Sequence, residues 1–204
     1  MPYFPFFTDL TGKPGLVVGG GTVALRKVEK LIPFTRNLIV LAPEICGAIR
    51  NIPGLTLVER SYVPGDESGM TFVIAATDDR SVNRTISERC QEARIPVNVV
   101  DDAELCTFLF PALVQRGQLT VGISTGGSSP TAAICLKEQI NALLPRRFDE
   151  ILDFLHAERS HMKSRFPTEA QRHVVLKDLF TAAMEAGRPL TAEEVADLFG
   201  EENA

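Results

Sequence analysis

A glycine-rich turn near the start of the chain is the first feature whose residue types and spacing could carry chemistry. Gly19, Gly20 and Gly21 follow the apolar run GLVV of residues 15–18. Gly19, Gly21 and Ala24 form the pattern G-x-G-x-x-A, in which the glycines permit a tight turn and the close approach of a pyrophosphate, and the small third residue lets a helix pack on a strand. Because the pattern opens the first strand–helix unit, it predicts nucleotide binding rather than a purely structural turn.

The residues after the second predicted strand bear on which dinucleotide this turn would hold. An acidic residue normally follows that strand and binds the ribose hydroxyls. Here Ala42 and Pro43 come first, and Glu44 follows. Either Glu44 turns back to the ribose or backbone groups bind it. No arginine follows at this strand end to receive a 2′-phosphate, so the sequence favours NAD over NADP.

Polar residues also follow the strand predicted at 71–76. Thr77, Asp78 and Asn83 fall near its carboxyl end, where they could line the cofactor. The alternative is that Asp78 or Asp79 only caps the helix that comes next. Both interpretations stay open from the sequence.

Asp101 follows the strand predicted at 96–100. It is expected to leave the carboxyl end of a central strand in the ligand crevice, whereas Asp102 is expected to face solvent. This position makes Asp101 a candidate catalytic residue. The alternative is an ordinary turn residue, because aspartate is common in turns.

Alternating strands and helices would position these candidates. Strands are predicted at 15–18, 37–41, 55–59, 71–76 and 96–100, each rich in the β-branched residues of a strand buried on both faces. Helical spacing follows the first strand until Pro33 and recurs after the fourth. The alternation predicts an α/β fold with a Rossmann-type doubly wound parallel sheet, and ligands beyond its carboxyl edge.

The pattern changes beyond residue 105. Two strands joined near the letters RGQ are predicted to form a hairpin, and Ser129 and Pro130 are the expected N-cap and first residue of a helix. From 146 onward the chain is predicted to be helical, with capping boxes and C-terminal glycines at Thr168/Gln171, Thr191/Glu194, Gly187 and Gly200. We therefore expect an NAD-binding domain at 1–112, a dimerisation region at 113–145 whose apolar surface the sheet cannot cover, and a small all-helical C-terminal domain at 146–204.

Composition excludes several classes of protein. The chain has 204 residues, a hydrophobic fraction of 45% and a formal net charge of -5, without a long basic run, which argues against a general nucleic-acid or membrane-surface role. Its N-terminus lacks a signal-peptide pattern, so a cytoplasmic protein is expected. The four scattered cysteines predict reduced, mostly buried thiols, and the histidines of the helical tail predict no metal site.

Taken together, four segments resemble the dehydrogenase and chelatase module of siroheme synthase, the precorrin-2 dehydrogenase family. They are VVGGGTVALRK, VLAPEI, IAATDDRSVN and VNVVDDAELCTFLFPALVQRGQLTVGISTGGSSP. The resemblance runs from about residue 5 to residue 145, and residues 146–204 share only the general character of the family's helical part. It implies an interlocked homodimer that uses NAD to oxidise precorrin-2 to sirohydrochlorin. In some members the same module also inserts ferrous iron to give siroheme.

The resemblance also implies roles for individual residues. The family's nucleotide contacts fall on Thr22 and Val23 in the glycine turn and on Pro43 and Glu44 after the second strand. Its essential aspartate, implicated in dehydrogenation and in chelation where present, falls on Asp101. Oxidation of the macrocycle releases a proton as well as a hydride, and Asp101 is the acid that the sequence places at this edge to accept it.

Some longer members of the family differ from this chain in two ways. They carry a fused methyltransferase domain, for which this chain has no room, so a separate enzyme is expected to supply precorrin-2. They also have a phosphorylatable serine at the position of Thr125, which keeps a hydroxyl group.

Precorrin-2 carries several carboxylates, so an acidic protein must supply local cations to bind it. The candidates, for each of which an exposed surface charge is the alternative role, are Arg26, Lys27, Arg80, Arg84, Arg116, Arg146 and Arg147.

Two other functions remain as alternatives. One is a binding module that senses NAD and contacts a partner through its helical tail, and the other is a dehydrogenase of a different small substrate. The position of Asp101 and the absence of a basic recognition helix count against the binding module.

Overall fold

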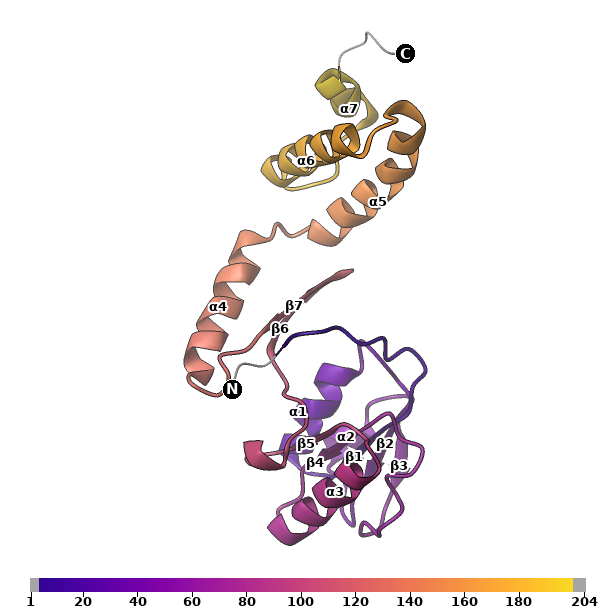
Figure 1. The fold of residues 1–204 in the computed structure, drawn as a ribbon, viewed down its shortest axis with the longest axis vertical. Coiled ribbons are helices and arrows are strands. Elements are labelled where there is room, and N and C mark those ends of the chain that lie inside the picture. Colours follow the sequence, from indigo (N-terminus) through magenta and orange to yellow (C-terminus); the bar gives the residue numbers. More distant parts are fainter. Residues whose placement is uncertain (1–3, 200–204) are drawn as a thin grey trace. The chain divides into compact units, whose positions relative to one another are not determined.

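The structure, a computed structural model, describes residues 4–199. The chain divides into two compact units, one formed by Phe6–Phe110 and the other chiefly by the residues from Pro111 onward (Figure 1). Gly200, predicted to end a helix, lies outside the described residues.

A five-stranded parallel sheet forms the centre of the Phe6–Phe110 unit. Its strands are β1 (Gly15–Val18), β2 (Leu38–Leu41), β3 (Thr56–Val58), β4 (Phe72–Ala75) and β5 (Val97–Val99), in the order β3-β2-β1-β4-β5. All five strands lie where the sequence predicted them, within one residue at each end. The sheet is therefore the predicted Rossmann-type arrangement.

Helices cover both faces of this sheet. Side chains alternate along β1, so that Val17 packs in the cluster with helices α1 (Thr22–Leu31) and α2 (Gly47–Arg50). Leu16 and Val18 pack in the opposite cluster with α3 (Arg80–Glu92). The doubly wound prediction is confirmed, whereas the short helix α2 and a 3-10 turn, η1 (Ala103–Leu105), were not predicted.

The position of β5 differs from the prediction for Asp101. β5 pairs only with β4 and is an edge strand of the sheet, not a central one. Strand order depends on long-range pairing, which local sequence patterns do not reveal. Asp101 still follows the carboxyl end of β5, on the same edge of the sheet as the glycine turn.

The second unit contains a hairpin followed by helices. Strands β6 (Ala112–Arg116) and β7 (Leu119–Ile123) pair antiparallel, and α4 (Pro130–Leu143), α5 (Phe148–Arg165), α6 (Glu169–Ala186) and α7 (Ala192–Phe199) follow. The Ser129 hydroxyl accepts the N–H of Ala132 at 3.1 Å, as an N-cap does. The predicted boxes at Thr168/Gln171 and Thr191/Glu194 and the left-handed Gly187 at the end of α6 are confirmed.

The cysteines are free, as predicted, but they are less buried than expected. Cys90 is buried, Cys46 and Cys106 are half-buried, and Cys135 is exposed. Within residues 4–199, no helix is long and apolar enough to cross a membrane.

Candidate functional site

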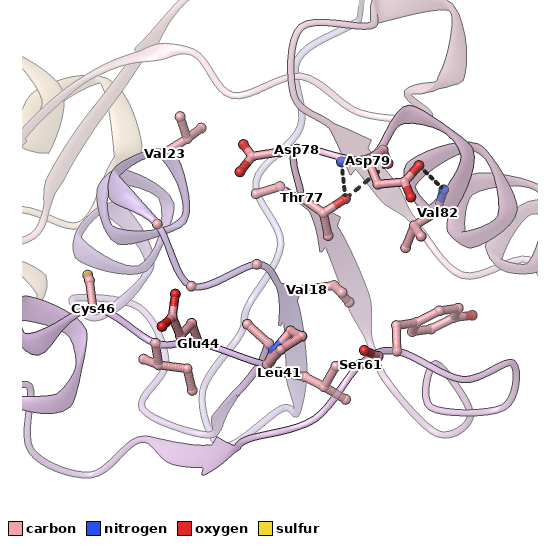
Figure 2. Close-up of a pocket in the computed structure, with 18 of the residues that line it drawn as sticks. Val18, Val23, Leu41, Glu44, Cys46, Ser61, Thr77, Asp78, Asp79 and Val82 are labelled. Atoms are coloured by element: carbon pink, nitrogen blue, oxygen red, sulfur yellow. Dashed lines mark hydrogen bonds between the residues drawn. The ribbon is translucent and has the colours of Figure 1, made fainter.

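A cavity of about 900 Å³ opens at the carboxyl ends of β1, β2 and β4 (Figure 2). Its size lies within the range of small-molecule sites, which is about 300–1,000 Å³. The eight residues predicted to bind the cofactor all line it, namely Gly19, Gly20, Gly21, Thr22, Val23, Pro43, Glu44 and Thr77. The structure thus brings together segments that are separated by more than fifty positions in the sequence.

Two of the three glycines are required by the protein's own backbone. Gly19 has a φ of 131°, and a Cβ atom there would overlap the carbonyl oxygen of Ala76. A Cβ atom on Gly20 would overlap the carbonyl oxygen of Glu44. The Gly20 carbonyl also accepts the N–H of Cys46 at 2.9 Å. These glycines let the loops after β2 and β4 approach the turn closely, so they shape the cavity.

The protein's own backbone does not require glycine at position 21. A Cβ atom there would meet no atom of the protein within 4 Å, and its φ of -88° is open to any residue. Gly21 is also the N-cap of α1, which has no side-chain cap and no acidic residue in its first turn. The first amides of α1 are therefore available to an anion, and the open side of Gly21 admits a group as large as a phosphate. The site fits the pyrophosphate of a dinucleotide.

Glu44 follows β2 on the rim of the cavity. Figure 2 shows Glu44 and Asp78 on opposite sides of the turn between Val18 and Val23. Glu44 is exposed, so its carboxylate is free to reach a ribose, as one of the two sequence interpretations requires.

Arg50 also lines the cavity, although the sequence analysis missed it. Its guanidinium donates two hydrogen bonds to the Glu59 carboxylate, at 2.7 and 2.8 Å, and a third to the Ile45 carbonyl at 2.9 Å. Arg50 lies on α2, whose four residues are too short to produce a helical period. Ser61 and Tyr62 also line the cavity, because they follow the carboxyl end of β3. The sequence analysis did not name them.

The loop after β4 shows which aspartate caps the helix, and both Asp78 and Asp79 line the cavity. The Asp79 carboxylate accepts the N–H groups of Ser81 and Val82, at 2.8 and 3.3 Å, and is the N-cap of α3. Hydrogen bonds from Ser81 hold its pKa below the ordinary value. Asp78 makes no such cap and lies exposed on the cavity wall. The helix-cap interpretation is therefore correct for Asp79.

Asn83 does not line the cavity, contrary to the sequence expectation. Only 5% of it is exposed, and its amide accepts from the Thr77 hydroxyl at 2.7 Å and donates to the Thr77 carbonyl at 2.9 Å. A buried amide must satisfy both of its polar groups, and Thr77 supplies the partners. Asn83 therefore positions Thr77 at the cavity wall.

Asp101 does not line this cavity. It is exposed and has a φ of 57°, the left-handed conformation that aspartate and asparagine tolerate better than most side chains. The described residues give its carboxylate no hydrogen-bond partner. Asp102 is half-buried, so it is less exposed to solvent than Asp101.

The half-buried Cys106 thiol holds the turn that carries Asp101. Its sulfur accepts the N–H of Val99 at 3.1 Å and lies 3.2 Å from both the Val99 and Asp102 carbonyl oxygens. These contacts fix the backbone on either side of Asp101. The Asp101 carboxylate is thus exposed to solvent on a turn whose backbone is held by hydrogen bonds.

None of the seven candidate cations lines the cavity. Six of them are exposed, and Lys27 is half-buried. Among residues 4–199, no group of three or more histidine, cysteine, aspartate or glutamate side chains is arranged to hold a metal ion. The Thr125 hydroxyl donates to the Ser129 carbonyl at 3.0 Å.

Comparison with known proteins agrees with this geometry. Residues 6–112 match a family described as putative NAD(P)-binding. The chain is 37% identical to siroheme synthase of Ectopseudomonas mendocina over 202 residues, which are 97% of this chain and 44% of that protein. It is also 37% identical to siroheme synthase of Thioalkalivibrio sulfidiphilus over 204 residues, with 97% and 42% covered. The chain thus spans less than half the length of these curated relatives.

A solved structure described as SirC, precorrin-2 dehydrogenase, shares the fold. Its TM-score is 0.76 at 23% sequence identity, with 97% of each chain covered. The resemblance of the sequence motifs to siroheme synthase is therefore confirmed by the sequence matches, and the fold by the structural match.

Proposed function

Because the chain belongs to the putative NAD(P)-binding family, we propose that it is an NAD-dependent precorrin-2 dehydrogenase, which oxidises precorrin-2 to sirohydrochlorin in siroheme biosynthesis. The observation that carries the proposal is the cavity beside Gly21, where a Cβ atom would meet no protein atom and where α1 begins without a side-chain cap. That cavity would hold a dinucleotide, and the substrate class comes from the siroheme synthase matches.

Residues of the cavity wall would bind the dinucleotide. The first amides of α1, at Thr22 and Val23, would hold the pyrophosphate, and Glu44 would hold a ribose. Thr77, fixed by Asn83, would contact the dinucleotide near the carboxyl end of β4. Bound NAD supplies the acceptor for the hydride that leaves the macrocycle.

Asp101 is the residue that we assign to the proton. Oxidation of a saturated position of the macrocycle releases a proton together with the hydride, and a positioned carboxylate is a suitable acceptor. Asp101 is unpaired and exposed at the same edge of the sheet as the cavity. Its exposure leaves the carboxylate accessible to a large substrate.

The sequence argument for NAD over NADP assumed that no arginine follows β2, but Arg50 on α2 lines the cavity, so the preference now rests on the partner of Arg50. Arg50 is the arginine on the cavity wall, and its guanidinium is already bound by the Glu59 carboxylate. A 2′-phosphate would have to displace Glu59, whereas a 2′-hydroxyl would not. A lower dissociation constant for NADP than for NAD would contradict this preference.

The proposed function has a direct test. Purified protein supplied with NAD should produce NADH, followed by its absorbance, when precorrin-2 is added and not when common 2-hydroxy acids are added. Sirohydrochlorin should accumulate in step with NADH. NADH formation from a hydroxy acid but not from precorrin-2 would favour a different dehydrogenase, and NAD binding without turnover of either would favour the binding module.

Residues 113–145 are proposed as the dimerisation region, and residues 146–204 as a separate helical domain. Helix α4 exposes Ile134, Leu136 and Leu143, at 53%, 45% and 74% of their surface. Apolar side chains gathered on one helix are typical of a subunit interface.

Light scattering of the purified protein is therefore expected to report a dimer at micromolar concentration. Leu136→Glu places a charge on the exposed face of α4 and should shift the protein toward monomer. Val174→Glu, on the exposed side of α6, is the matched control and should leave the dimer intact. A wild-type monomer, or equal dissociation by both variants, would contradict the assignment.

A further inference from the structure

Lys27 differs from every other basic side chain of the Phe6–Phe110 unit. All residues of this unit are described, and among its lysines and arginines only Lys27 is half-buried, while the rest are exposed. Its ammonium donates to the Asn98 side-chain oxygen at 3.1 Å and lies 4.2 Å from the centroid of the Phe110 ring. An amide oxygen and an aromatic face therefore hold a cation that has left bulk water.

The partner amide is itself fixed. Only 4% of Asn98 is exposed, and its amide nitrogen donates to the Phe108 carbonyl at 3.0 Å and lies 3.5 Å from the Cys106 sulfur. Because the nitrogen is committed to these acceptors, the amide oxygen is left to receive Lys27. The surroundings of Asn98 thus determine where the ammonium of Lys27 lies.

Lys27 has no anionic partner within the described part of the chain. An ammonium carries three donors, and Asn98 accepts from one. Burial lowers the pKa of Lys27, and neighbouring Lys30 lowers it further, whereas Cys106 and Asp101 act in the opposite direction. Asn98, which holds the ammonium, lies on β5 three residues before Asp101, so Lys27 lies against the segment that carries Asp101, although the two form no ion pair. A half-buried cation with unused donors is a favourable place for an anion to bind.

We propose that Lys27 binds a carboxylate of the tetrapyrrole substrate beside Asp101, and so contributes affinity for the substrate. The inference rests on the proposed function. The phosphates of the dinucleotide are a second source of negative charge, but Lys27 does not line the cavity in which they would lie. The same contact would disfavour uncharged substrates, because they would leave the ammonium without a counterion.

Lys27→Gln tests the proposal, since glutamine can still donate to Asn98 but carries no charge. Loss of one charge-assisted hydrogen bond is expected to raise the KM for precorrin-2 about 10- to 100-fold. The kcat at saturating substrate and the Kd for NAD should stay within about twofold, because neither depends on the lost ion pair. Lys27→Arg keeps the charge and should recover part of the loss. Lys30→Gln, exposed on the same helix, is the matched control and should leave all three values unchanged.

Binding of the product, sirohydrochlorin, gives a readout that does not need turnover. Wild-type protein should bind it by absorbance titration, and Lys27→Gln should bind it more weakly by the same factor as the change in KM. Equal KM and product affinity in Lys27→Gln and wild type would overturn the inference, and the proposed function would stand. A loss of NAD affinity, or a fall in kcat with a lower melting temperature, would assign Lys27 to the nucleotide or to the fold instead. Wild-type protein that neither oxidises precorrin-2 nor binds sirohydrochlorin would refute the proposed function itself.

Discussion

Replacing Asp101 by asparagine is expected to lower the rate of precorrin-2 oxidation by about 10²–10⁴-fold, the usual contribution of a positioned general base. Asparagine keeps the size of the side chain but removes the charge that accepts a proton. It also tolerates the left-handed conformation of Asp101, whose φ is 57°, so the turn should keep its shape. Steady-state rates at saturating NAD and substrate would measure the effect.

The affinity for NAD provides the first control for this variant. Asp101 does not line the cavity at the glycine turn, so calorimetry should give the same Kd for NAD in Asp101→Asn and wild type. Asp102→Asn is the matched second control. Asp102 contacts Cys106 through its backbone carbonyl, which the substitution leaves in place, so its oxidation rate should stay close to that of wild type. A wild-type rate in Asp101→Asn would remove Asp101 from the mechanism.

The same variant also tests whether the protein inserts iron. Insertion of a metal ion into sirohydrochlorin releases pyrrole protons, so one carboxylate could serve both reactions. If the protein also inserts Fe²⁺, both activities are expected to fail together in Asp101→Asn. Wild-type protein that releases sirohydrochlorin without accelerating Fe²⁺ or Co²⁺ insertion would be a dehydrogenase only.

The sheet could be predicted because its strands are buried on both faces. Short β-branched runs such as those of β1 and β4 have no polar alternation, and the helices between them repeat their apolar residues with helical spacing. α2 has four residues, too few to show a helical period. The order of the strands leaves no local pattern in the sequence either. The edge position of β5 could therefore be learned only from the pairing of β4 with β5.

The cavity was predictable where the backbone itself forms it. The glycine turn and the residues directly after β2 and β4 must lie at one edge of a parallel sheet, and they do. Side-chain direction was less predictable. Asn83 turns inward because its amide is hydrogen-bonded to Thr77, and Asp102 is more buried than Asp101. Local sequence carries little information on those contacts.

Replacing Gly21 by valine is expected to abolish NAD binding without unfolding the sheet. A side chain at Gly21 meets no protein atom within 4 Å, and valine readily adopts the extended backbone of this residue, whose φ is -88° and ψ is -168°. The branched side chain would instead occupy the space in which a pyrophosphate reaches the first amides of α1. Calorimetry with NAD and a thermal melt of the same sample would separate the two effects. The cost to folding should be about 1 kcal/mol or less, because valine is a poorer N-cap than glycine.

The neighbouring glycine supplies the contrast that makes this result interpretable. A Cβ atom on Gly20 overlaps the Glu44 carbonyl, which belongs to the backbone and cannot rotate away. Gly20→Ala is therefore expected to lower the melting temperature clearly, and to weaken NAD binding only as a consequence of the distorted loop. If glycine were needed at both positions for the same reason, the two variants would lose stability together. Gly21→Val with normal stability and normal NAD affinity would show that no phosphate lies against this turn, and the dinucleotide site would have to be placed elsewhere.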